Sequence, residues 1–115
     1  ELARVIQGID KASVVLVDCL SLWINNLLFR SENEEKLISE EDIVTRCEEL
    51  LCASAPINGS VIFVTNEVGM SIVPADPISR RYRDLLGRCN QTIARRADEV
   101  VFMVAGLPMY AKKMR

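Results

Sequence analysis

Apolar residues along the chain fall into short continuous runs, separated by longer stretches in which they recur at helical spacing. The run Ser13–Asp18 is rich in β-branched residues, which is typical of a strand buried on both faces. Ser60–Thr65 repeats the pattern, and Glu99–Val104 forms a third run that Gly106 to Pro108 is expected to end. The pattern therefore predicts three strands.

The first helical stripe follows the first strand. Apolar residues recur at spacings of three and four from residue 20 to residue 28, on one side of a helix that ends near Phe29 or Arg30. From Ser31 to Asp42 the composition changes to Glu, Asn, Ser and Lys. This change favours a solvated connection over a binding tail.

Two further helices are marked by their first residues. Ser39 and Asp42 have the pattern of a capping box, and the stripe that follows extends to about Ser54. Asp76 is a favourable N-cap, and Pro77 suits the first helical position. The buried side of this third helix is expected to consist of Ile78, Tyr82, Leu85, Cys89, Ile93 and Ala97. Gly87 lowers the propensity of this helix by about 1 kcal/mol, and we expect it to allow close packing against a neighbour.

The order of these elements is strand, helix, helix, strand, helix, strand. This order is typical of βαβ crossovers in an α/β protein with a parallel sheet. With 115 residues, the chain amounts to one domain or less. We therefore expect residues 1–115 to belong to a single α/β domain.

Composition argues against several classes of function. The 14 basic and 16 acidic side chains give a net charge of −2, without the basic cluster that a DNA or RNA partner requires. The apolar runs are far shorter than the roughly 20 residues that span a bilayer, so we expect no membrane partner. Four irregularly spaced cysteines and the lack of histidine argue against a zinc site or a disulfide framework. We expect a cytoplasmic protein with reduced, buried thiols.

Polar side chains follow the first two strands, and ligands of open parallel sheets bind outside the carboxyl ends of strands. Asp18 ends its strand in the manner of a Walker B carboxylate, which orients Mg²⁺ beside nucleotide phosphates. A cap on the helix that begins at Leu20 is the alternative role for Asp18. Asn66 and Glu67 follow the second strand, where they either complete a cleft for Mg²⁺ and nucleotide or only shape a turn.

A group of arginines lies on the third predicted helix. Arg80, Arg81 and Arg83 occupy its first turns, near the same edge of the sheet if the crossover is regular. Their guanidinium groups are suited to phosphate, and a solvated helix face is the alternative.

Two elements of nucleotide chemistry are missing from the sequence. It contains no G-x-x-x-x-G-K-[ST] motif to hold phosphates, and no histidine to act as base or acceptor. We therefore do not expect this chain alone to be a P-loop enzyme.

Four stretches of the sequence carry long motifs in order: VVLVDCLSLWINNLLF at 14–29, VTNEVGMSIVP at 64–74, RRYRDLLGRCNQ at 80–91 and ADEVVFMVAGLP at 97–108. They resemble the bifunctional adenosylcobinamide kinase/adenosylcobinamide-phosphate guanylyltransferase family of cobalamin biosynthesis. The resemblance extends from about Val14 to Pro108. We therefore expect the chain to be the C-terminal portion of such an enzyme.

The resemblance implies a RecA-like P-loop fold and two reactions. The first is phosphorylation of adenosylcobinamide by ATP or GTP, and the second is transfer of GMP from GTP through a guanylylated histidine to give adenosylcobinamide-GDP. In the family, the Walker A loop and the acceptor histidine precede the segment matched here. The chain is thus expected to be an incomplete α/β domain without a Walker A segment, and inactive by itself.

The resemblance also implies roles for individual residues. Asp18 takes the Walker B position, with an indirect role in binding Mg²⁺, and Asn66 and Glu67 lie beside the nucleotide. The family's R-x-R-D-like run, which serves phosphate, corrinoid or subunit contacts, is matched by Arg80, Arg81, Arg83 and Asp84. The expected partners are adenosylcobinamide, the nucleotide and further copies of the chain, since the family forms oligomers with sites near subunit boundaries.

Two other hypotheses remain open at this point. One is a non-catalytic interaction domain that keeps the scaffold without the phosphate loop. The other is a nucleotide-binding half domain with a different substrate. An upstream reading frame with the phosphate-binding motif would favour the enzyme over the first alternative, and corrinoid binding would exclude the second.

Overall fold

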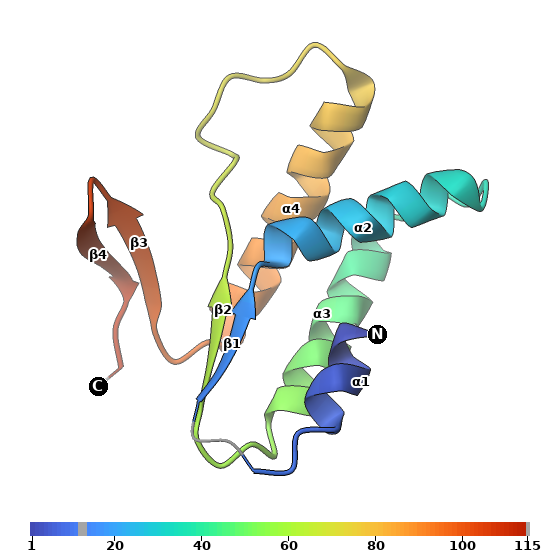
Figure 1. Ribbon diagram of the computed structural model, residues 1–115. Coiled ribbons are helices and arrows are strands. Elements are labelled where there is room, and N and C mark those ends of the chain that lie inside the picture. The colour runs from blue at the N-terminus through green and yellow to red at the C-terminus, as the bar shows by residue number, and fades with distance from the viewer. Residues whose placement is uncertain (12–13, 115) are drawn as a thin grey trace.

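The computed structural model describes residues 1–11 and 14–114. Helices and strands alternate along most of this part of the chain (Figure 1). In order, the elements are α1 (Leu2–Gln7), β1 (Val14–Asp18), α2 (Leu20–Asn33), α3 (Glu40–Ser54), β2 (Ser60–Val64), α4 (Pro77–Arg96), β3 (Val100–Val104) and β4 (Leu107–Lys112).

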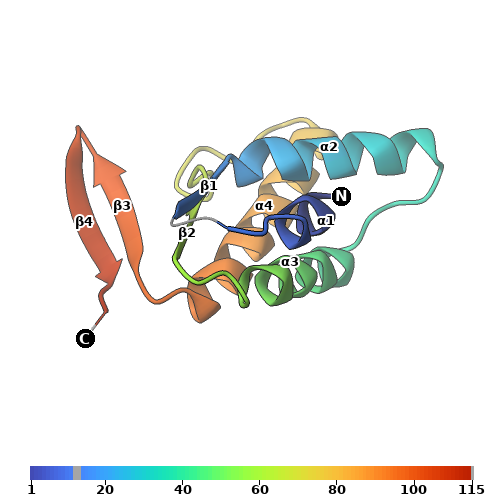
Figure 2. The ribbon, with the colours of Figure 1, turned by 60° about the horizontal axis from the view of Figure 1, so that its bottom comes forward.

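A parallel strand pair and a layer of helices form the body of the molecule. β1 pairs with β2 in parallel, with Val14 opposite Ser60 and Asp18 opposite Val64. The helices lie on one side of this pair, and the β3–β4 hairpin stands on the other side (Figure 2). The connection through α2 and α3 thus confirms the predicted crossover between the first two parallel strands.

The β1 strand is covered on one face only. Val15 and Val17 point into the core, whereas Val14 and Leu16 are 59% and 61% exposed. The prediction of a strand buried on both faces is therefore wrong, because the helices cover just one side of it. Ser13, the first residue of the predicted strand, lies outside the described residues.

The core is centred on the contact between α3 and α4. Apolar residues at helical spacing on the two helices face each other and are at most 1% exposed: Ile43, Cys47, Leu50, Leu85, Leu86 and Cys89. Residues of α1, β1 and α2 pack around them. Burial of such side chains is the main favourable contribution to folding.

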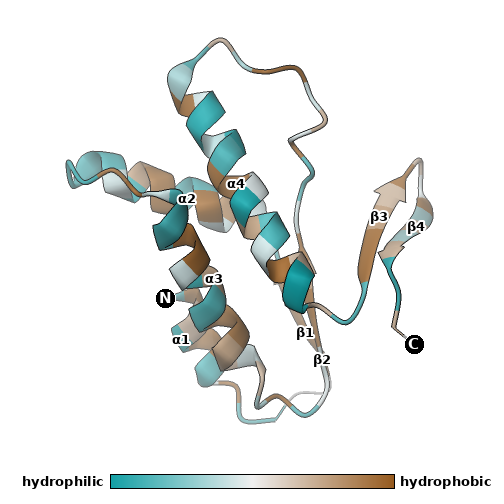
Figure 3. Cartoon of the chain, turned by 180° about the vertical axis from the view of Figure 1, so that it is seen from behind, coloured by the Kyte–Doolittle hydropathy of each residue, from teal (hydrophilic) through white to brown (hydrophobic). Residues whose placement is uncertain are grey.

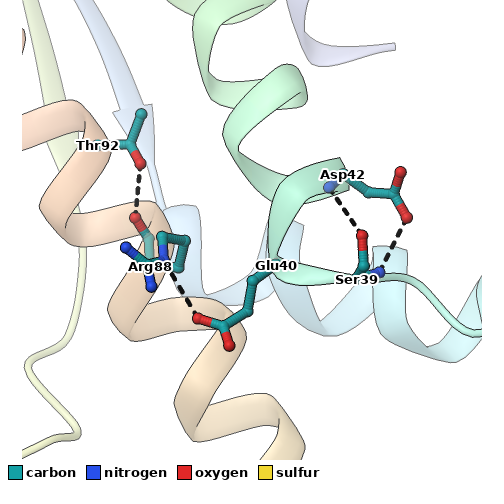
Figure 4. A network of polar contacts seen from close by, with 5 residues as sticks. All are labelled: Ser39, Glu40, Asp42, Arg88 and Thr92. Atoms are coloured by element: carbon teal, nitrogen blue, oxygen red, sulfur yellow. Dashed lines mark hydrogen bonds and ion pairs between the residues drawn. The ribbon is translucent and has the colours of Figure 1, made fainter.

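The predicted helix starts are confirmed by side-chain caps. Ser39 Oγ accepts from Asp42 N at 3.1 Å, and Asp42 Oδ2 accepts from Ser39 N at 2.9 Å, which completes the capping box of α3 (Figure 4). Asp76 Oδ2 accepts from Ser79 N at 3.0 Å at the start of α4. These hydrogen bonds lower the pKa values of both carboxyl groups. Figure 4 also shows Arg88 of α4 bound to Glu40 of α3.

Three predictions within the helices are wrong. α2 continues to Asn33, and Ser31 is buried in its last turn, where its hydroxyl donates to the Leu28 carbonyl. Ile78 is exposed because the first turns of α4 extend beyond the other helices (Figure 1). A Cβ at Gly87 would meet no atom within 4 Å, so this glycine does not allow close packing within the described chain.

The third predicted strand does not join the parallel sheet. β3 pairs with β4 in an antiparallel hairpin, and β1 and β2 form a separate two-stranded sheet. The turn consists of Ala105 and Gly106, both at positive φ, as in the two-residue turns that suit hairpins. Pro108 belongs to β4 instead of ending the strand, and proline is tolerated in such edge strands.

The cysteines differ in their surroundings. All four are free, and only Cys47 and Cys89 are fully buried, whereas Cys52 is exposed and Cys19 is half-buried. The prediction of reduced thiols is consistent with this, but the prediction that they are all buried is wrong. Among the helices that the structure describes, none is long and apolar enough to cross a membrane.

Candidate functional site

The candidate site lies at the carboxyl ends of β1 and β2. Asp18 is opposite Val64 in the register of the parallel pair, and Thr65, Asn66 and Glu67 follow Val64 directly. The parallel pairing therefore brings Asp18 and the polar triplet to one edge of the sheet, as the sequence predicts. Beyond this edge, the chain continues as an irregular loop that leads to α4 (Figure 1).

Asp18 is exposed at this edge and does not cap α2. The N-cap of α2 is Cys19, and the helix start has no side-chain cap hydrogen bond. The alternative role of Asp18 as a helix cap is therefore wrong. Its carboxylate remains accessible beside the polar triplet.

Asn66 is held by hydrogen bonds to its backbone N–H, its side-chain amide and its carbonyl oxygen. Its backbone N–H and its side-chain amide both donate to the Ser21 hydroxyl oxygen, at 3.0 and 2.9 Å. Its carbonyl oxygen accepts from Asn90 Nδ2 at 3.0 Å, and Asn90 Oδ1 in turn accepts from the Thr65 hydroxyl at 2.6 Å. The end of β2 is thus anchored to both α2 and α4.

Sequence reasoning missed Ser21 and Asn90. Ser21 is 6% exposed, and its carbonyl oxygen accepts from the Tyr82 hydroxyl at 3.2 Å, while burial raises the pKa of Tyr82. A polar residue in the first turn of a helix that follows a strand was a usable signal for Ser21. For Asn90, the usable signal was its polar side chain next to Cys89, which is on the predicted buried side of the helix.

Glu67 shapes the start of the loop. Its Oε1 accepts from the Gly69 N–H at 2.7 Å, and a Cβ at position 69 would approach this oxygen to 2.9 Å. The turn-shaping role that the sequence left open is therefore present. Oε1 of Glu67 makes this hydrogen bond. Glu67 is exposed at the candidate site, and its Oε2 does not take part in the turn.

Two of the predicted arginines bind the backbone of the same loop. Arg83 donates to the carbonyl oxygens of Val68, Gly69 and Ser71, at 3.3, 2.7 and 3.3 Å. Arg80 donates to the carbonyls of Pro74 and Ala75, at 3.1 and 2.7 Å. The loop is thereby fastened along the first turns of α4.

Arg81 and Asp84 lie apart from these contacts. Arg81 Nη2 donates to the carbonyl of Ile38 in the connection between α2 and α3, and its Nε is buried without a partner within the described chain. Arg81 therefore joins α4 to that connection and not to the sheet edge. Asp84 is exposed on α4. The predicted run is thus divided among the β2–α4 loop, the α2–α3 connection and solvent.

The donor set at the edge suits Mg²⁺ only together with a ligand. Within residues 1–11 and 14–114, no group of three or more His, Cys, Asp and Glu side chains is placed to hold a metal ion. Mg²⁺ usually keeps several waters and is bound through one or two carboxylates plus substrate phosphates. The exposed Asp18 carboxylate at this edge fits that mode of binding.

Two cavities of the body lie elsewhere. One of about 660 Å³ is formed by α1 and the end of α3, and one of about 510 Å³ lies between α2 and the start of α3. Neither is lined by Asp18, Asn66 or Glu67. The carboxyl edge of the strand pair is therefore the candidate site on positional grounds.

Comparison with known proteins shows the class to which this chain belongs. The family described as "Cobinamide kinase / cobinamide phosphate guanyltransferase" matches residues 1–111, and the chain belongs to this family. Among curated relatives, the "Bifunctional adenosylcobalamin biosynthesis protein CobP" of Pseudomonas aeruginosa is 41% identical over 98 residues, which cover 85% of this chain and 53% of the relative.

Two enterobacterial relatives carry the name "Bifunctional adenosylcobalamin biosynthesis protein CobU". The protein of Escherichia coli K12 is 34% identical over 110 residues, covering 90% of this chain and 61% of the relative. The protein of Salmonella typhimurium is 36% identical over 104 residues, covering 85% and 58%. The chain therefore spans between 53% and 61% of the length of these relatives. The resemblance found in the four motifs is confirmed.

Proposed function

We propose that this chain is the C-terminal portion of an adenosylcobinamide kinase/adenosylcobinamide-phosphate guanylyltransferase of cobalamin biosynthesis. The supporting observation is the meeting of Asp18 with the Thr65-Asn66-Glu67 triplet at one sheet edge in a chain of this family. The complete enzyme would have a RecA-like P-loop fold and act as a cytoplasmic homo-oligomer. Its Walker A loop and acceptor histidine would lie in the part of the relatives that this chain does not span.

Two reactions follow from this proposal. In the first, the aminopropanol hydroxyl of adenosylcobinamide attacks the γ-phosphorus of ATP or GTP, loses its proton, and releases the nucleoside diphosphate. In the second, a histidine takes GMP from GTP with release of pyrophosphate. The phosphate oxygen of adenosylcobinamide phosphate then displaces the histidine and yields adenosylcobinamide-GDP.

Within these reactions, the chain supplies a carboxylate and a fixed backbone. Asp18 would orient Mg²⁺, which neutralises charge on the nucleotide phosphates when it is bound. Ser21 and Asn90 would hold Asn66 so that the triplet keeps its place at the edge. Arg80 and Arg83 would act through the loop that they fasten, because Nη1 of Arg80 and both Nε and Nη2 of Arg83 donate to its backbone carbonyls. By itself the chain would be inactive.

The test uses the complete protein that the gene encodes, with Asp18→Asn as the variant. We expect the kinase kcat to fall by about 10²-fold or more, because the charge that positions the metal is lost. Asp98→Asn is the matched control, since Asp98 is also exposed but lies between α4 and β3. Covalent labelling of the protein by GTP is the second readout. Equal kcat values for both variants, with the circular dichroism spectrum unchanged, would remove Asp18 from the site.

The second candidate function is a non-catalytic interaction domain. Exposed apolar side chains along β3 and β4 favour it, because apolar strands without cover are suited to a partner. The upstream coding sequence separates the two functions. A G-x-x-x-x-G-K-[ST] motif and GTP labelling support the enzyme, whereas a start codon at this chain and no labelling support the interaction domain.

A further inference from the structure

The loop between β2 and α4 presents apolar side chains to solvent. Ile72 is 91% exposed and Met70 77%, and Val73 and Ile78 are 60% and 53% exposed. We call these four residues the apolar patch. Three of them lie on the loop and Ile78 lies in the first turn of α4, so all four fall within nine residues of the sequence. Exposed apolar side chains that gather in this way mark interaction sites.

Polar contacts hold the loop in place and leave the apolar patch outside. Arg83 and Arg80 together bind five backbone carbonyls between Val68 and Ala75. Within the loop, the Ser71 hydroxyl donates to the Val68 carbonyl at 2.6 Å. A loop ordered by its own chain loses little conformational entropy when a ligand binds. The exposure of the apolar patch is therefore a property of the folded loop.

The loop starts at the candidate site. Thr65, Asn66 and Glu67 are its first residues, and it rises from the carboxyl edge of β2 to the start of α4 (Figure 1). A ligand that rests on the apolar patch would thus share this loop with Asn66 and Glu67, which follow the strand that pairs with β1 at Asp18.

We propose that the apolar patch binds the corrin ring system of the cobinamide substrate while its aminopropanol arm reaches the phosphoryl donor. This inference rests on the proposed function. A corrinoid is a broad macrocycle whose rim carries methyl groups between amide arms, so a few fixed apolar side chains suit the apolar part of one face. Asn66 and Glu67 at the base of the loop provide polar groups on the side of the reacting centre.

The size of the apolar patch distinguishes this occupant from a second protein chain. A stable protein interface buries about 800 Å² on each partner and involves about 20 to 30 residues on each side. The four side chains of the apolar patch are far fewer than that. The apolar patch has the extent expected for one face of a ring-shaped ligand.

The test compares two serine substitutions in the complete protein. Ile72→Ser removes the most exposed member of the apolar patch without touching the core, and Leu37→Ser is the matched control, since Leu37 is 68% exposed in the connection between α2 and α3. We expect the Kd for cobinamide, measured by equilibrium dialysis with detection of corrinoid absorbance, to rise about tenfold in Ile72→Ser. The Kd for MgGTP should stay unchanged in both variants.

The outcomes separate this inference from the proposed function. Equal cobinamide affinity in Ile72→Ser and the unaltered protein overturns the inference alone. If the unaltered protein binds MgGTP but no cobinamide, the proposed function fails and the inference fails with it. A shift of Ile72→Ser to a smaller assembly in size-exclusion chromatography overturns the inference in favour of a contact between copies, whatever the corrinoid affinity.

Discussion

The α3–α4 contact and the β3–β4 hairpin both contain large apolar side chains, but only those of the helix contact are covered by a second element. Leu86 in the helix contact is 0% exposed, whereas Leu107 in the hairpin is 68% exposed. Figure 3 shows hydrophobic residues along β3, in contrast to the hydrophilic outer side of α4. An apolar run thus shows which residues would gain free energy from burial. Whether they are buried depends on the packing of a second element against them.

The hairpin is held mainly by its own ladder. An isolated two-stranded hairpin is marginally stable in water. Two further hydrogen bonds join it to the body, from Lys112 Nζ to the carbonyls of Ala94 and Arg95 at 3.2 and 3.0 Å. We therefore regard the hairpin as a unit of lower local stability than the helix layer.

The largest expected effect comes from the same substitution made in both regions. Leu86→Ala should lower the free energy of unfolding of this chain by about 2–5 kcal/mol, because it leaves a cavity between α3 and α4. Leu107→Ala should change it by no more than about 0.5 kcal/mol, as expected for an exposed site. Urea denaturation followed by circular dichroism measures both. Similar losses in the two variants would show that the hairpin is covered in solution.

The second expected effect is the change in stability when glycine is replaced by alanine in each of the two regions. Gly87→Ala should stabilise the chain by about 0.5–1 kcal/mol, because the new methyl group meets no atom and alanine favours the helix. Gly106→Ala should weaken the hairpin by about 1 kcal/mol, since Gly106 has a φ of +76°. Urea midpoints measure the first change, and amide hydrogen exchange of β3 and β4 measures the second. A loss of stability in Gly87→Ala would mean that a neighbour approaches position 87.

The smallest expected effect is a pH dependence confined to the helix layer. Hydrogen bonds from Ser79 and Ser39 lower the pKa values of Asp76 and Asp42 from an ordinary value of 3.8. Both carboxylates therefore stabilise the fold above pH 3.8, and this contribution is lost as the pH falls through their lower folded values. Amide exchange in the first turns of α3 and α4 should increase in that range.

Asp76→Asn provides the control for this dependence. Asparagine keeps a side-chain oxygen for the N-cap but does not titrate, so the acid sensitivity at the start of α4 should disappear. Equal acid sensitivity in the variant and the unaltered chain would assign the effect to other groups.

Local patterns were sufficient for the elements of the body. The capping box at Ser39 and the Asp76-Pro77 start each depend on neighbours within four residues, so the sequence alone predicts them. The two parallel strands and the meeting of Asp18 with the polar triplet also follow from order and spacing. Exposure of Leu16 and Ile78 was not predictable, because it depends on where other elements end.

The hairpin and the arginines show where such reasoning fails. Pro108 suggested a strand end, although the two-residue Ala105-Gly106 turn between apolar runs was a usable hairpin signal. Arg80 and Arg83 have a charge that suits phosphate, yet they donate to carbonyl oxygens of the loop that precedes α4. A loop conformation of this kind is set by tertiary contacts that no spacing pattern contains.

The buried cysteines Cys47 and Cys89 can report how often the α3–α4 contact opens. Contact with Cys47 and burial raise the pKa of the Cys89 thiol, and the thiolate is the reactive form. A thiol reagent should therefore modify exposed Cys52 at once, and Cys47 or Cys89 only during moments when α3 and α4 separate. The ratio of the slow to the fast modification rate gives the opening equilibrium of the helix layer in unaltered purified protein, without denaturant.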